Sequence, residues 1–311
     1  MILVLVIALA CTLAWAIVVA LPPLVWPLAN ASVNALHRQL ARSDSWLARR
    51  VPATWAATLS EGPVLAVLAA ALIFGVWAFF GILEDVMMGD PITGLDQVVY
   101  RRLQSLRQPG SDSVFVALTE MGDSRVVVPV SLAAFAGLVW LRRWRAAQFL
   151  TLAIAGTAVF VGGVKHYIHR PRPVAIYDGV AQYSFPSGHA AMSMVLYGAL
   201  AILLIHGAPP RWRRPIASAA LTLILLISFS RIYLGAHWLS DVLAGLAFGI
   251  AWLSALAIVY LRANPDAVPA KPFAAVLIAA LFTAATAHMI HDLANDTGRY
   301  SIPPQLVPKA P

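Results

Sequence analysis

Three short stretches, far apart in the chain, carry the residue types that binding and attacking a phosphoryl group would require. They run from Lys165 to Pro173, from Pro186 to His189 and from Ser230 to Asp241. Together they supply several cations, two histidines, a carboxylate and a turn. A phosphoryl group is multiply anionic, and its transfer depends mainly on positioning and on the neutralisation of charge. These stretches therefore predict chemistry on a phosphate ester or diphosphate.

Spacing within the stretches suggests what each side chain does. His237 and Asp241 lie four residues apart, so on a helix they share one face. There the carboxylate can fix the imidazole tautomer and leave the other ring nitrogen with a free lone pair, as a nucleophile requires. Ser187 and Gly188 precede an apolar run, so their hydroxyl and amide lie at a predicted helix N-terminus that favours an anion.

Cations complete the predicted phosphate site. Arg172 and Arg231 offer planar forks for bidentate contacts, and Lys165 adds a compact charge. The residues between these positions are expected to be exposed polar loop residues: His166, His169 and Arg170. No metal site is predicted, because the spacing of His288, His291 and Asp292 resembles a ligand set only weakly.

Composition determines the setting of this chemistry. Of 311 residues, 60% are hydrophobic and 12% are charged, whereas ordinary soluble domains have about 25% charged residues. A mean hydropathy of +0.77 excludes a soluble globular fold, and most of the surface must face lipid. The net charge of +8 does not predict nucleic-acid binding, because the basic residues lie between apolar runs. The single cysteine, Cys11, excludes an intramolecular disulfide.

Eight apolar runs are each near the roughly 20 residues that a membrane-crossing helix needs. The first lacks a basic N-terminal region and a clear cleavage site, so it is interpreted as a span rather than a removed signal peptide. The sequence therefore predicts an all-α fold, a polytopic transmembrane helix bundle of about eight spans. The runs are Met1–Leu21, Pro63–Leu83, Val126–Leu141, Ala146–Val164, Ala190–Ile205, Pro215–Ser230, Val242–Leu261 and Phe273–Ile290.

The loops between the runs predict which way the spans face, because Lys and Arg concentrate on the cytoplasmic side. If the spans alternate, twelve basic residues fall on one face, which is then cytoplasmic. The outer face receives Glu84–Ser124, Lys165–Pro186, Arg231–His237 and the tail from His291, so the phosphate chemistry is expected there. The twelve are Arg38, Arg42, Arg49, Arg50, Arg142, Arg143, Arg145, Arg211, Arg213, Arg214, Arg262 and Lys271.

A short amphipathic helix is predicted in the first outer segment. Thr93–Asp96 is interpreted as its capping box, and the helix would lie either along the headgroups or over the bundle. Its apolar side contains Leu95, Val98, Val99, Leu103 and Leu106, and its basic side contains Arg101, Arg102 and Arg107. Elsewhere, the small residues of Gly245–Gly249 predict close helix packing.

The ordered pattern Lys-x6-Arg-Pro, Pro-Ser-Gly-His and Ser-Arg-x5-His-x3-Asp resembles the signature of the type 2 phosphatidic-acid phosphatase superfamily, and every position is filled. The resemblance covers about Leu118 to Leu261. It implies a metal-independent two-step hydrolysis without a cofactor. In it His237 attacks phosphorus to give a phosphohistidine, Asp241 orients His237, and His189 protonates the departing oxygen and later deprotonates water. The residues implied to hold the phosphoryl oxygens are Lys165, Arg172, Ser187, Gly188 and Arg231.

The resemblance also implies a six-helix phosphatase core with its active site at the outer membrane–water boundary. The predicted division is residues 1–62 as an N-terminal span and basic cytoplasmic segment, 63–261 as the core with the site at 165–241, and 262–311 as a C-terminal span and outer tail. An integral protein of a bacterial inner (plasma) membrane is expected, with the site on the periplasmic or outer side. The sequence does not specify an oligomeric state.

A site at headgroup depth makes lipid phosphates the expected substrates, with membrane lipids as surroundings and no nucleic-acid partner. Candidates are undecaprenyl diphosphate, phosphatidylglycerol phosphate, phosphatidic acid and a lipid A phosphate, because the motifs read only the phosphoryl group. Two alternatives stay open: a lipid phosphotransferase that uses the same phosphohistidine, and a transporter or scramblase that binds a headgroup without cleaving it. Vanadate-binding haloperoxidases have similar motifs but are typically soluble, and the eight spans argue against them.

Overall fold

The computed structural model describes residues 2–41, 62–89, 91–176 and 179–300. Most of this part is helical, and it contains no strand, only an isolated bridge between Pro171 and Tyr183. Eight of its helical segments are long and apolar enough to cross a membrane, which confirms the predicted all-α bundle. The predicted basic residues Arg42, Arg49 and Arg50 and the tail beyond residue 300 lie outside the described residues.

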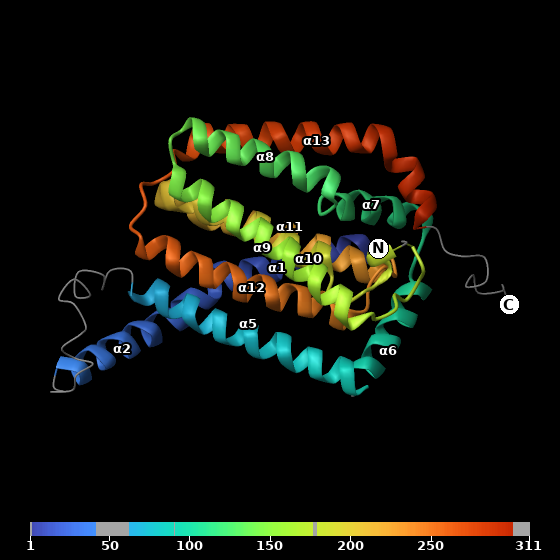
Figure 1. The fold of residues 1–311 in the computed structure, drawn as a ribbon, viewed down its shortest axis with the longest axis horizontal. Helices are drawn as coiled ribbons and strands as arrows, with labels where there is room; N and C mark the ends of the chain where they lie inside the picture. Colours follow the sequence, from blue (N-terminus) through green and yellow to red (C-terminus); the bar gives the residue numbers. More distant parts are fainter. Residues whose placement is uncertain (1, 42–61, 90, 177–178, 301–311) are drawn as a thin grey trace.

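Long helices run side by side through the molecule, and α6 runs across one end of the bundle (Figure 1). The π-helical turn η1 joins α1 to α2. The elements are α1 (Ile2–Trp15), η1 (Ala16–Ala20), α2 (Leu21–Ala41), α5 (Gly62–Met88), α6 (Pro91–Ser105), α7 (Pro109–Glu120), α8 (Ser124–Trp140), α9 (Trp144–Ile168), η3 (Gly179–Gln182), α10 (Gly188–Gly207), α11 (Pro210–Tyr233), α12 (Leu239–Arg262) and α13 (Ala270–Arg299).

The third crossing is longer than the sequence predicted. Residues 110–140 form one candidate span, in which α7 and α8 follow one another across a turn at 121–123. Phe115 and Val116 of α7 are fully buried, so this helix packs within the bundle and is not an exposed loop, and the outer position expected for Glu84–Ser124 stays a prediction. The sequence analysis did not assign α7 to a span because the helix contains the acidic residues Asp112 and Glu120. In the structure Asp112 pairs with Arg107, and Glu120 pairs with His288.

The predicted short amphipathic helix exists as α6, but its predicted capping box is wrong. The helix begins at Pro91, and the Thr93 hydroxyl donates to the carbonyl oxygen of Gly89 at 3.3 Å instead of capping a helix that starts later. Val99 and Leu103 pack against the bundle. The other apolar residues, Leu95, Val98 and Leu106, are about half exposed. The helix is therefore seated on the bundle along one side and presents apolar side chains along another.

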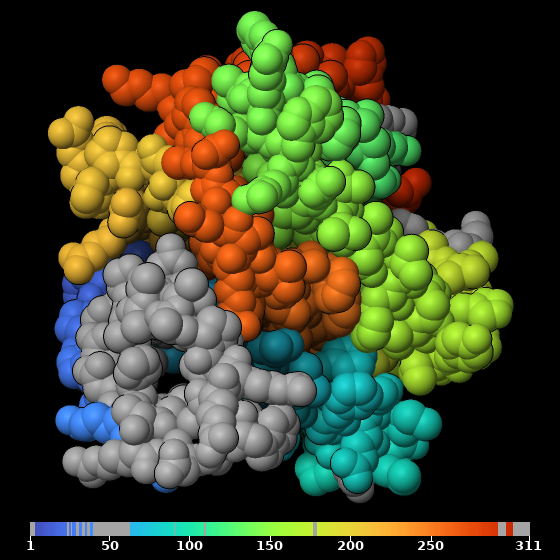
Figure 2. Space-filling view, turned by 60° about the vertical axis from the view of Figure 1, so that its left-hand side comes forward, coloured from blue at the N-terminus to red at the C-terminus, as the bar shows by residue number. Residues whose placement is uncertain are grey.

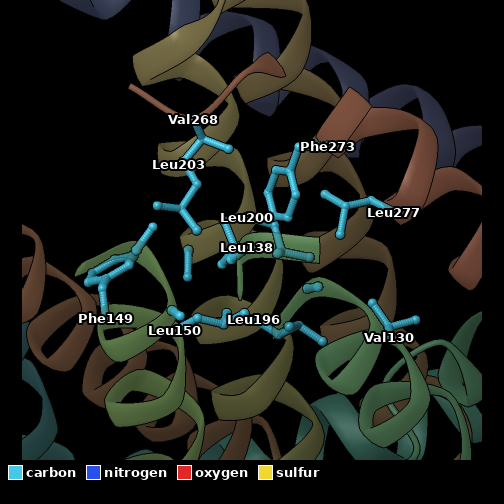
Figure 3. Packing of buried hydrophobic residues seen from close by; sticks show 14 of the residues in the cluster. Val130, Leu138, Phe149, Leu150, Leu196, Leu200, Leu203, Val268, Phe273 and Leu277 are labelled. Carbon is cyan, nitrogen blue, oxygen red and sulfur yellow. The ribbon is translucent and has the colours of Figure 1, made fainter. Parts of the chain in front are cut away.

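The largest hydrophobic core lies where α8, α9, α10, α12 and α13 pack together (Figure 3). Glycines bring α12 close to its neighbours. A Cβ atom on Gly245 would lie 2.6 Å from the carbonyl oxygen of Ser187, and one on Gly249 would lie 2.8 Å from Cβ of Met194. The close packing predicted for Gly245–Gly249 is thus confirmed, and it places the start of α10 directly against α12.

The two ends of the bundle differ in the residues they carry. One end holds the turns α8–α9, α10–α11 and α12–α13, which come to the surface together in Figure 2. Eight of the predicted cytoplasmic basic residues lie in or beside these turns: Arg142, Arg143, Arg145, Arg211, Arg213, Arg214, Arg262 and Lys271. The three phosphate-directed stretches lie at the other end, beside α6 (Figure 1).

Candidate active site

The three stretches meet where α9 and α11 end and where α10 and α12 begin. The first stretch leaves the end of α9 and continues into a loop that packs beside α12. The second forms the start of α10, and the third joins α11 to α12 through a tight turn at Gly235, whose φ of 71° lies in the left-handed region. Helix ends therefore bring together residues that are separated by up to 76 positions, from Lys165 to Asp241.

His237 is held between a cation and a carboxylate. Its Nε2 lies 2.9 Å from Nη1 of Arg172, and its Nδ1 lies 3.5 Å from Oδ2 of Asp241. A guanidinium can only donate, so Nε2 must be the acceptor and the neutral ring carries its proton on Nδ1, toward Asp241. The lone pair that could attack phosphorus is therefore on the side of the cations.

Burial and charge keep this imidazole neutral. His237 is 2% exposed. Burial is the largest cause that lowers its pKa well below 6.5, and the positive charges of Arg172, Lys165 and Arg231 lower the pKa further. A neutral ring is the form that a nucleophile needs.

The Asp241 carboxylate is held by groups on several elements. Its Oδ2 accepts a hydrogen bond from the backbone N–H of Trp238 at 2.9 Å, and its Oδ1 accepts one from Nη1 of Arg170 at 2.6 Å. The backbone N–H of Ser187 donates to the Asp241 carbonyl oxygen at 2.9 Å, which ties α10 to α12. The expectation that Arg170 is an exposed loop residue is wrong, because its side chain is only 12% exposed and bridges two carboxylates. His166 and His169 are exposed, as predicted.

The predicted phosphate-binding cations all lie around His237, each tied to neighbouring groups. Lys165 is buried, and its Nζ donates to the carbonyl oxygens of Tyr183 and Ser184. Arg172 donates to the carbonyl oxygens of Ala181 and Ala236, at 2.8 to 2.9 Å and at 2.6 Å. These hydrogen bonds, mostly to backbone carbonyl oxygens, hold the two cations in place.

Arg231 is fully buried at the end of α11. Its Nη1 donates to Oγ1 of Thr119 and to the hydroxyl of Tyr300, both at 2.8 Å. The guanidinium also lies over the Tyr300 ring, 5.5 Å from its centroid. Tyr300 follows α13, so a segment far along the chain reaches a cation of the site.

The start of α10 carries the remaining predicted residues. Ser187 is the N-cap of this helix and is fully buried, and its Oγ accepts from the backbone N–H of Ala190 at 3.5 Å. Gly188 is the first helical residue, so the amides of the predicted anion site are at a helix N-terminus. The next residue, His189, has its Nε2 4.0 Å from Oδ2 of Asp123.

The side chains of Arg170, Thr119, Asp123 and Tyr300 contact predicted site residues although the sequence analysis did not assign them, and Asp96 contacts the site through Arg170. The sequence analysis interpreted Arg170 as an exposed loop residue and Asp96 as part of a capping box. Thr119 lies in the last turn of α7, and Asp123 lies in the turn between α7 and α8, where a Cβ on Gly122 would lie 3.2 Å from Cδ2 of His189. No local spacing pattern connects these residues to the site, because each reaches it from another element.

A buried histidine and two carboxylates lie beside this turn. Nε2 of His288 is 2.5 Å from Oε2 of Glu120, and one ligand-type atom each from Glu120, Asp123 and His288 lie within 4.8 Å of one another. His291 is exposed instead. The group differs from the weak pattern seen in the sequence, since His288 turns into the bundle toward α7.

Comparison with known proteins places this geometry in a family. The model of the PAP2 superfamily matches residues 146–265. Phosphatidylglycerophosphatase B from Bacillus subtilis (strain 168) is 28% identical over 180 residues, which cover 56% of this chain and 88% of the relative. A lipid A 1-phosphatase from Rhizobium etli is 36% identical over 171 residues, 47% of this chain and 69% of the relative. An undecaprenyl-diphosphatase from Sulfolobus acidocaldarius is 30% identical over 155 residues, with coverages of 47% and 69%.

A solved structure shares the fold. It is the crystal structure of a transmembrane PAP2-type phosphatidylglycerolphosphate phosphatase from Bacillus subtilis, with a TM-score of 0.56, 22% sequence identity and coverage of 61% of this chain and 96% of that one. The family match, the relatives and the eight candidate spans agree with one another. This chain is an integral membrane protein that belongs to the PAP2 superfamily.

Proposed function

We propose that the protein is a lipid phosphatase that hydrolyses a phosphomonoester or diphosphate through a phosphohistidine on His237. The observation that carries the proposal is the arrangement of this ring, with Nε2 beside Arg172 and Nδ1 toward Asp241. The phosphatase names of the relatives from B. subtilis, R. etli and S. acidocaldarius support the same activity. The substrate class we propose is a lipid phosphate whose tail stays in the bilayer.

The proposed first step forms a bond between Nε2 of His237 and phosphorus and breaks the bond from phosphorus to the leaving oxygen. His189 donates a proton to that oxygen, and the Asp241 carboxylate stabilises the positive charge that develops on the His237 ring. Lys165, Arg172 and Arg231, with the Ser187 hydroxyl and the Gly188 amide, hold the phosphoryl oxygens. The cations neutralise the charge of the transferred group, so the mechanism needs no metal ion.

The proposed second step returns the enzyme to its starting state. His189, now without its proton, takes one from a water molecule that attacks phosphorus. The bond between phosphorus and His237 breaks, and inorganic phosphate leaves. We place the site on the periplasmic or outer side of a bacterial inner membrane, because the basic turns lie at the other end of the bundle.

The test is phosphate release by purified full-length protein from mixed micelles of phosphatidic acid, phosphatidylglycerol phosphate, undecaprenyl diphosphate and a lipid A phosphate, with and without EDTA. We expect release from at least one lipid, unchanged by the chelator and lost in His237→Ala. Full activity in His237→Ala would refute the nucleophile. Loss with EDTA would refute metal independence and would direct attention to Glu120, Asp123 and His288. Labelled phosphate found on a second lipid instead of in solution would identify a phosphotransferase.

A further inference from the structure

We propose that Asp96, on α6, is a positioning residue for this reaction, acting on His237 through Arg170 and Asp241. The inference rests on the proposed function and adds a residue to it. Asp96 lies outside residues 146–265, which match the family model, and none of the three signature stretches contains it. It is the one acidic residue of α6, and its side chain is 1% exposed.

Both oxygens of the Asp96 carboxylate accept hydrogen bonds from Ser240, at the start of α12. Oδ1 accepts from the backbone N–H of Ser240 at 2.8 Å, and Oδ2 accepts from the Ser240 hydroxyl at 2.6 Å. These contacts satisfy an N–H group in the first turn of α12, which begins at Leu239. A residue of α6 therefore caps the helix that carries Asp241.

Arg170 connects the two carboxylates. Its Nη2 donates to Oδ2 of Asp96 at 2.7 Å, while its Nη1 donates to Oδ1 of Asp241 at 2.6 Å and to Oγ of Ser240 at 2.7 Å. The guanidinium also lies over the Trp238 ring, 5.8 Å from its centroid. One planar cation is thus divided between two buried anions, and its orientation depends on both.

This division leaves Oδ2 of Asp241 available to the reacting ring. Oδ2 accepts from Trp238 and faces Nδ1 of His237 at 3.5 Å. Without the charge of Asp96, the Arg170 fork can turn and bind both oxygens of Asp241 in the bidentate manner that guanidinium and carboxylate prefer. Arg170 would then compete with His237 for Oδ2 and weaken the contact that must strengthen when the ring becomes positive.

The effect is expected on the chemical step rather than on phosphate binding. The charged and titratable groups that surround His237 are Arg172, Lys165, Arg231, His189 and Asp241. In the contacts described above, Asp96 meets only Ser240 and Arg170. Its loss should therefore lower kcat while KM stays close to the wild-type value.

The experiment compares Asp96→Asn with the wild type in the full-length protein, with phosphatidic acid in mixed micelles as the probe. We expect kcat to fall about tenfold and KM to change less than about twofold, because misplacement of a catalytic group by a fraction of an ångström is costly. In an Asp241→Asn background, the further loss from Asp96→Asn should be less than about twofold, because the two residues act in one chain of contacts. Equal losses in both backgrounds would overturn the proposal.

Two further variants separate positioning from folding. Asp112→Asn breaks the other acid–arginine pair near α6, 2.9 Å from Arg107, and is expected to keep wild-type kcat. Arg170→Lys keeps the cation but loses the fork, and is expected to lower kcat as Asp96→Asn does. If Asp96→Asn does not elute as a folded protein, Ser240→Ala takes its place, since it removes a contact of Asp96 without changing charge. A wild-type kcat in Asp96→Asn or in Arg170→Lys would refute the role.

Binding of orthovanadate and of inorganic phosphate tests the proposal without turnover. Vanadate adopts the five-coordinate geometry of the transition state with a nitrogen ligand, so it reports the position of the His237 ring, whereas phosphate reports the cations. If wild-type protein cleaves no lipid of the panel, the proposed function fails by itself. The positioning role is then tested by calorimetry. Asp96→Asn should weaken the affinity for vanadate about tenfold and the affinity for phosphate less than about twofold. Equal changes, or no vanadate binding by the wild type, would overturn it.

Discussion

At the scale of single residues, the protein keeps one imidazole neutral among positive charges. His237 is buried, and its Nε2 accepts a hydrogen bond from a guanidinium, so the nitrogen that we propose as nucleophile carries no proton and needs no base to remove one. Arg170 binds Oδ1 of Asp241, while Oδ2 faces Nδ1 of His237. Oδ2 is therefore positioned to stabilise the positive charge that would develop on the ring during the reaction. The same cations that hold phosphate would therefore also prepare the ring that attacks it.

The pH dependence of kcat/KM is expected to show this preparation. Because the pKa of His237 is held well below 6.5, the ring stays neutral as the pH falls through 6.5, and the acid limb of kcat/KM should lie below that pH. The measurement uses wild-type enzyme at subsaturating lipid phosphate, with the ionisation of the lipid followed by phosphorus NMR in the same micelles. An acid limb at or above pH 6.5, after correction for the lipid, would show a protonated ring in the free enzyme.

At the scale of elements, the site depends on the close approach of α10 and α12. Gly245 allows the start of α10 to lie against α12, and the Ser187 N–H then reaches the carbonyl oxygen of Asp241. This contact joins the proposed anion-binding turn to the helix that carries the carboxylate. Helix α6 supports the same junction from outside, through Asp96 and Ser240.

Substitution of Gly245 by alanine is expected to separate these two helices. The new Cβ would lie 2.6 Å from the Ser187 oxygen, so the protein should lose stability, by about 1–3 kcal/mol for an overpacked contact, and kcat should fall with it. Gly162→Ala on α9 is the matched control, because nothing lies within 4 Å of its Cβ and alanine favours a helix by up to about 1 kcal/mol. Thermal unfolding in detergent and phosphate release measure both variants. A wild-type melting temperature in Gly245→Ala would contradict the packing argument.

At the scale of the whole molecule, parts beyond the family match complete the site. Residues 146–265 match the family model, yet Asp96 precedes them and Tyr300 follows them. Tyr300 reaches Arg231 from the end of α13, and His288 of the same helix pairs with Glu120. Helix α6 and the end of α13 therefore contact the rest of the bundle at the end that holds the proposed active site.

The orientation of the bundle in a cell membrane can be read with single cysteines. In a Cys11→Ser background, Gln182→Cys lies at the site end and Ala267→Cys lies in the turn at the basic end, and both positions are exposed. We expect a membrane-impermeant maleimide to label Gln182→Cys in intact spheroplasts, and Ala267→Cys only after the membrane is opened, because basic turns stay cytoplasmic. The reverse pattern would place the site inside the cell.

The sequence by itself predicted the membrane setting and the phosphatase class. Long charge-free runs such as Pro63–Leu83 predict membrane-crossing helices, so the all-α bundle follows from composition. The approach of His237 to Asp241 was predicted from their spacing of four residues. The expectation that both lie on one helix is wrong, because α12 begins at Leu239 and His237 lies in the turn before it. Only the tertiary structure decided that Arg170 binds Asp241, that Asp96 caps α12, and that Tyr300 reaches Arg231. Such contacts depend on how separate helices pack, and no spacing along one chain segment encodes a contact between ends of different helices.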